Sequence, residues 1–160
     1  AQDDKQAVYW YEKSAEQGDA TAQVNLGFMY DLGRGIAQDD KQAVYWYEKS
    51  AEQGHAPAQV NLGLMYREGK GIAQDDKQAV YWYQKSAEQG NARAQYNLGF
   101  MYARGRGVAQ DDTLAHMWSN IAASTGYKNA TENRDIVAKR MSPSQIEKAQ
   151  DMAREWIAKH

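Results

Sequence analysis

The residue types that most often carry out chemistry are few and scattered in this chain. The three histidines, His55, His116 and His160, lie far apart in different kinds of segment. No H-x-x-x-H pair and no acidic cluster with ligand spacing occurs, and cysteine is absent, so neither a metal site nor a disulfide scaffold is predicted. Gly33 and Gly35 end a helical pattern, whereas a phosphate-binding loop opens a helix after a strand. We therefore predict no enzymatic activity and no cofactor.

The paired aspartates have a structural interpretation. An aspartate before a helix can accept a backbone N–H, and a glutamine three residues later can complete a capping box. The pattern therefore predicts helix starts instead of cation sites. It occurs three times, as Asp3 with Gln6, Asp39 with Gln42 and Asp75 with Gln78.

The elements that position every side chain come from a repeat of 36 residues. Residues 37–72 match residues 1–36 at 30 of 36 positions, residues 73–108 match them at 29 of 36, and a fourth, diverged copy opens at residue 109. Each block contains two helical patterns, a B helix from Asp3 to Gly18 and an A helix from about residue 20 to 32. One helix pair cannot bury its own apolar surface but stacked pairs can, which is the physical basis of a solenoid.

The two helices have different predicted faces. The core face of the B helix is Ala7, Tyr11, Ser14 and Ala15, and that of the A helix is Ala22, Leu26, Met29 and Tyr30. Gly27 lies inside the A helix, where glycine costs about 1 kcal/mol relative to alanine. Its recurrence at Gly63 and Gly99 predicts a close approach of another element at this point.

At this stage the sequence resembles a known family. The phrase A-x-x-x-L-G-x-x-Y-x-x-G-x-G-[IV]-x-x-D-x-x-x-A-x-x-W-Y-x-K-[AS]-A-x-Q-G is typical of Sel1-like repeats, relatives of tetratricopeptide repeats, and it runs here from Ala22 to Gly54. The resemblance implies an all-α, right-handed α-α superhelix (solenoid) whose A helices line a concave surface. It also implies adaptor or scaffold work, often in bacterial envelope or secreted proteins. A periplasmic or secreted location is therefore favoured, and a cytoplasmic one stays open.

The last part of the chain departs from the repeat. Leu114, Met117 and Ile121 replace polar residues on the outer face of the fourth B helix and create an apolar stripe. A tail helix opening at Ser142 and Pro143 is predicted to cover it, through the stripe Ile146, Ala149, Ala153 and Trp156. We expect repeats over residues 1–126, with an incomplete first unit, and a degenerate last A helix with a capping helix over residues 127–160.

Function is expected where the copies differ. The B helices are nearly invariant, whereas the A helices diverge over an arc of about 100° opposite their predicted core face. Apolar, amide and guanidinium groups on this arc suit contact with a peptide or another protein. The alternative is packing or drift, and bracing between repeats explains the asparagines equally well. The predicted partner-binding residues are Val24, Asn25, Phe28, Val60, Asn61, Leu64, Arg67, Arg93, Tyr96, Asn97, Phe100 and Arg104.

Other functions compete with that hypothesis. The unfinished first repeat leaves apolar surface open, which favours either removed upstream repeats or pairing into a homodimer or larger assembly. A ladder of Tyr9, Tyr45 and Tyr81, each four residues before a lysine, forms a second outer surface. Some cysteine-rich relatives carry a β-lactamase label, but this chain has no cysteine and no S-x-x-K, S-D-N or K-T-G motif, which argues against a hydrolase.

Composition excludes several partner classes. The net charge of −2 and a pI near 5.9 provide no footprint for nucleic acid, so none is expected as partner. No apolar run approaches the roughly 20 residues that a membrane-spanning helix needs, so no insertion is expected. The identity of the protein partner is not encoded in these patterns.

Overall fold

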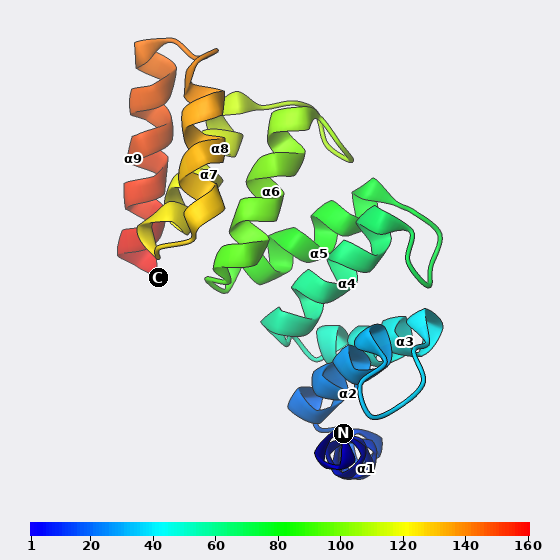
Figure 1. Ribbon diagram of the computed structural model, residues 1–160. Helices are drawn as coiled ribbons and strands as arrows, with labels where there is room; N and C mark the ends of the chain where they lie inside the picture. Colours follow the sequence, from blue (N-terminus) through cyan, green and yellow to red (C-terminus); the bar gives the residue numbers. More distant parts are fainter. The chain divides into compact units, whose positions relative to one another are not determined.

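The computed structural model describes residues 1–160 as nine α-helices without strands (Figure 1). The chain forms two compact units, Ala1–Trp82 and Tyr83–His160, and α5 runs through the junction. None of the helices combines the length and apolar character required to cross a bilayer. The helices are α1 (Gln2–Glu16), α2 (Ala20–Leu32), α3 (Asp40–Glu52), α4 (Ala56–Glu68), α5 (Asp76–Glu88), α6 (Ala92–Arg104), α7 (Asp112–Ser124), α8 (Lys128–Ala138) and α9 (Pro143–Lys159).

The predicted pairing of B and A helices is confirmed: α1, α3, α5 and α7 are B helices, and α2, α4, α6 and α8 are A helices. Asp39 accepts hydrogen bonds from the backbone N–H groups of Lys41 and Gln42 at 3.0 and 3.1 Å, as its predicted capping role requires. The predicted cap at Asp3 is wrong, because α1 begins at Gln2 and contains Asp3. The N–H of Asp39 donates to the Tyr30 carbonyl at 3.0 Å, and the same bond recurs before α5, from Asp75 to Tyr66 at 3.0 Å, and before α7, from Asp111 to Tyr102 at 3.1 Å.

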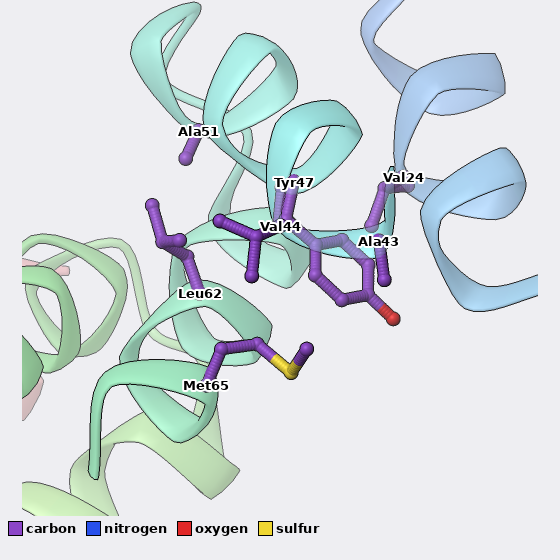
Figure 2. Packing of buried hydrophobic residues seen from close by; sticks show 8 residues of the cluster. Val24, Ala43, Val44, Tyr47, Ala51, Leu62 and Met65 are labelled. Carbon is purple, nitrogen blue, oxygen red and sulfur yellow. The ribbon is translucent and has the colours of Figure 1, made fainter. Parts of the chain in front are cut away.

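In the first unit, α2 packs between two B helices. Leu26 is fully buried against residues of α1, including Val8 and Ala15. Val24 lies 200° away around the helix and joins a second cluster with Val44 and Tyr47 of α3 (Figure 2). Because it has a B helix on either side, an A helix buries two of its faces instead of one.

The glycine inside the A helix has the predicted packing role. A Cβ at Gly27 would lie 2.7 Å from the ring of Tyr47, a side chain that is itself 1% exposed. At Gly99 in the second unit the nearest atom is the hydroxyl of Ser119, also at 2.7 Å. Ser119 holds the repeat position that Tyr47 holds in α3, so the last repeat keeps the close approach with a smaller partner.

In α2, α4 and α6 a buried glutamine connects the A helix to the preceding B helix. Gln23 donates from Nε2 to the carbonyl of Ala15 at 3.1 Å, and Gln95 does the same to Ala87 at 3.1 Å. These carbonyls belong to the last turns of B helices, where backbone acceptors lack partners within the helix. The glutamines are therefore buried because they complete hydrogen bonding at a helix end.

The predicted end cap is confirmed in the second unit. α9 runs alongside α7 (Figure 1), and Ala149 and Ala153 are fully buried there. Ile121 of α7 is 1% exposed, and the ring of Trp156 meets Trp118 edge-on with centroids 5.8 Å apart. Ser142 and Gln145 form the predicted capping box at the start of α9. Burial of the α7 stripe is therefore what places the tail helix.

Candidate partner-binding surface

Three of the predicted contact residues lie in the core. Val24, Val60 and Asn97 are only 7%, 3% and 5% exposed, so the prediction that they face a partner is wrong. The arc opposite the predicted core face is in part a second core face, because the A helix packs on two B helices. The helical wheel of a single helix cannot reveal that second neighbour.

The other predicted residues keep some surface. Phe28 is 42% exposed, and Arg93 and Arg104 are exposed as well. The remaining members of the set are half-buried, namely Asn25, Asn61, Leu64, Arg67, Tyr96 and Phe100.

A hollow of about 320 Å³ brings three predicted residues together in the second unit, between α6 and α8. Ile136 of α8 is 51% exposed there and lies one repeat after Phe100 of α6. The residues of α8 were not among the predicted contact residues, although the 36-residue register aligns Ile136 with Phe100. The lining residues are Tyr96, Phe100 and Arg104 from α6, and Asn129, Glu132, Asn133 and Ile136 from α8. We call this the α6–α8 groove.

The groove carries one charge of each sign. The Arg104 guanidinium carbon lies 5.4 Å from the centroid of the Phe100 ring, so the ring supports the cation while its donors stay accessible. Glu132 is exposed and forms no ion pair, since the nearby Arg134 pairs with Asp135 at 2.9 Å and reaches Asn120. The groove therefore combines the apolar side chains of Phe100 and Ile136 with a mainly polar lining and two charges that form no ion pair.

A second hollow, in the first unit, is smaller, and its two charged lining residues already form an ion pair with each other. It measures about 270 Å³ between α1 and α2 and contains the predicted residues Asn25 and Phe28. Its two charged lining residues, Asp4 and Arg34, bind each other at 3.0 Å. Less charge is therefore available to an incoming partner here than in the α6–α8 groove.

The asparagine series divides between bracing and surface roles. Asn133 donates from its amide nitrogen to the Ser119 hydroxyl at 2.7 Å, which ties α8 to α7, and Asn97 is buried. Asn25 lines the hollow beside α1. Asn97 and Asn133 therefore take part in helix packing, which is the bracing alternative left open for the asparagines.

The tyrosine ladder is exposed as predicted. Tyr9, Tyr45 and Tyr81 are 50%, 47% and 50% exposed. Each meets the next residue, a tryptophan, edge-on with centroids 5.0 to 5.2 Å apart. Lys13 lies 4.4 Å above the Tyr9 ring and Lys49 lies 5.0 Å above the Tyr45 ring. Each of these tyrosine rings therefore already contacts a tryptophan of its own helix, and the rings of Tyr9 and Tyr45 also contact a lysine of their own helix.

One histidine belongs to the buried framework of the second unit. His116 of α7 is 3% exposed, and its Nδ1 has no hydrogen-bond partner. Burial lowers the pKa of His116 below its usual value, and the positive charge of Arg134 lowers it further, against the opposing effect of Asp135. The equivalent positions in the other copies are Val8, Val44 and Val80, so the histidine replaces a core valine.

The paired helices, the buried glutamine and the glycine contact together define an all-α protein of helix-pair repeats, as predicted. The Sel1 repeat model matches residues 1–19, 20–55, 56–91 and 92–127. The chain therefore belongs to the Sel1 repeat family, whose members are commonly protein-interaction scaffolds and generally non-catalytic.

Solved structures agree with this assignment. A protective antigen present in uropathogenic Escherichia coli strains is 41% identical with a TM-score of 0.90, over 96% of this chain and 33% of that one. This chain thus spans a third of that antigen. A Sel1 repeat protein from Oxalobacter formigenes is 38% identical with a TM-score of 0.71, covering 78% of this chain and 94% of that one. Helicobacter pylori cysteine rich protein B, 23% identical with a TM-score of 0.64 over 81% and 93%, shares the fold. No curated protein matches the sequence.

Proposed function

We propose that this chain is a non-enzymatic binding module that holds a segment of another protein in the α6–α8 groove. The observation that carries the proposal is the apolar pair Phe100 and Ile136, which stays accessible between an unpaired cation and an unpaired anion. Apolar anchors within a polar rim are the usual composition of a binding site for a protein segment. The family's common scaffold role agrees with this function.

The test is selection of peptides from a random display library on the full chain. Peptides selected on the wild type are then titrated against a double variant, Phe100→Glu with Ile136→Glu, and against Leu32→Glu as matched control. Leu32 is 52% exposed on α2 and lines neither hollow. We expect at least tenfold weaker binding to the double variant and unchanged binding to the control. Circular dichroism checks folding, and failure to select any peptide, or equal binding by all three proteins, would overturn the proposal.

Self-assembly through α1 is a second candidate, favoured by one observation. Trp10 is 65% exposed, whereas Trp46, at the same position of the next repeat, packs against the cluster that contains Val8 and Leu26. A second copy could cover Trp10 in the same way. Light scattering over a range of concentrations tests this: association that Trp10→Lys abolishes supports it, and a monomer at high concentration contradicts it.

A non-enzymatic binding module is also expected not to hydrolyse β-lactams. Incubation with a chromogenic β-lactam should leave the substrate intact over the same period in which a control β-lactamase consumes it. Turnover above the background rate would contradict the non-enzymatic assignment.

A further inference from the structure

The α6–α8 groove has a polarity along its length. Residues one repeat apart hold equivalent places on successive A helices, so Glu132 corresponds to Tyr96 and Ile136 corresponds to Phe100. Arg104 lies two helical turns beyond the place of Tyr96, about 12 Å at 1.5 Å per residue. The groove therefore presents an anion toward one end, an apolar middle and a cation at the other end.

We propose that the groove selects an extended segment whose groove-facing side chains, at alternate positions, are a basic, an apolar and an acidic residue. This rests on the proposed function and adds the chemistry of the partner. The basic side chain would pair with Glu132 and the acidic one with Arg104, while the apolar side chain between them covers Phe100 and Ile136. Successive side chains of an extended chain point to opposite faces, so positions i, i+2 and i+4 face the groove together. At about 3.3 Å per residue these positions span about 13 Å, close to the offset of the two charges along the helix axis.

The amides of the groove support an extended backbone. Asn129 is exposed on α8 and lines the groove. Asn133 has its amide nitrogen bound to Ser119, which leaves its amide oxygen to accept a backbone N–H. A helical ligand satisfies its own backbone and gains nothing from these amides, whereas an extended one does.

The charges of the groove are available to the ligand. The hollow beside α1 shows the alternative arrangement, because Asp4 and Arg34 neutralise each other there at 3.0 Å. In the α6–α8 groove Arg104 rests on the Phe100 ring and Glu132 has no ion pair. Complementary charges mainly determine which partner is accepted, so the prediction concerns specificity more than affinity.

The experiment is a specificity switch with three synthetic peptides of equal length. Each carries a central leucine and, two positions to either side of it, a charged residue; the two charged residues are lysine and glutamate, two glutamates or two lysines. Binding to the full chain is measured by fluorescence anisotropy. We expect the wild type to prefer the lysine and glutamate peptide. Glu132→Lys should shift the preference to the two-glutamate peptide and Arg104→Glu to the two-lysine peptide, each by about tenfold at low salt.

Lys148→Glu on α9 is the charge control, because Lys148 is exposed and does not line the groove. It should keep the wild-type preference. If the peptides bind and Phe100→Glu with Ile136→Glu abolishes binding, but Glu132→Lys and Arg104→Glu leave the order of preference unchanged, the charge selection is wrong while the binding function stands. If no peptide binds the wild type and library selection also fails, the binding function itself is wrong.

Discussion

Two tryptophans at the same position of the repeat have opposite environments. Trp10 of α1 is 65% exposed, and its aromatic and cationic contacts are with Tyr9 and Lys13 of its own helix. Trp118 of α7 is 6% exposed and meets Trp156 of α9. The same residue at the same register is thus surface in one unit and core in the other.

The difference shows that burial in a repeat protein depends on the neighbouring element. In α7, Met117 and Ile121 stand where α5 has Tyr81 and Lys85, and both are buried. These replacements provide the apolar surface on which α9 packs. The outer face of a B helix is therefore adapted to water or to another helix by a few side chains, while the helix itself is unchanged.

The largest expected effect is the loss of stability when Trp118 is replaced, compared with the small loss when Trp10 is replaced. Trp118→Ala should lower the free energy of unfolding by about 3–5 kcal/mol, because it leaves a cavity between α7 and α9. Trp10→Ala should change it by less than about 1 kcal/mol, because the ring already faces water. Urea unfolding followed by far-ultraviolet circular dichroism measures both. Equal losses would contradict the assigned burial.

The close-packing glycines sharpen the comparison of the last repeat with the others. Gly27→Ala should destabilise the chain by about 2 kcal/mol, since the new methyl group collides with the buried ring of Tyr47. Gly99→Ala should cost less, because Ser119 is the nearest neighbour and the gain in helix propensity offsets part of the strain. Thermal unfolding of both variants provides the comparison, and a larger loss for Gly99→Ala would show that the smaller partner does not relieve the contact.

His116 should make the second unit sensitive to acid. Its pKa is lowered in the folded state, so the unfolded chain binds the proton more readily and stability falls as pH drops below about 6.5. His116→Val restores the repeat residue and removes a buried atom without a partner, which should stabilise by about 1–2 kcal/mol at low pH. Unfolding midpoints between pH 5 and 8 test this, with His55→Ala as the control at a half-buried site. A gain that does not grow toward acid pH would contradict the role of protonation.

The smallest expected effects concern the ion pairs of the two units. The Arg140 guanidinium donates hydrogen bonds from two nitrogens to the Asp112 carboxylate at 2.6 to 2.9 Å, and it also donates to the Ala103 carbonyl at 2.7 Å. Arg140→Ala should cost about 1 kcal/mol, and Arg34→Ala, which removes one exposed pair with Asp4, about 0.3 kcal/mol. Urea midpoints at low and high salt measure both losses, and the reverse order would contradict the importance of the bidentate geometry.

Much of the candidate site was accessible from the sequence, and the incorrect or missing assignments have two physical causes. Phe28, Phe100 and Arg104 keep surface as predicted, because they lie on the part of the A helix between its two buried faces. Tyr96 is half-buried although it holds the repeat position of the buried Val24. Val24 was misplaced, since a helical wheel assigns one core face and cannot show that a second B helix packs on the other side. Glu132 and Ile136 were overlooked because α8 has diverged from the repeat.

The sequence by itself determined the repeat, the helix pairs, the glycine contact and the capping helix. These are local or periodic properties, and each copy of the 36-residue repeat supports the interpretation of the other copies. Only the tertiary structure decided that Trp10 is exposed while Trp118, at the same position of the repeat, is buried. It also decided that Asn133 forms a hydrogen bond to α7. It also decided that Arg104 and Glu132 line one groove. Such properties depend on which surfaces from distant residues meet, and periodicity within one helix carries no information about that meeting.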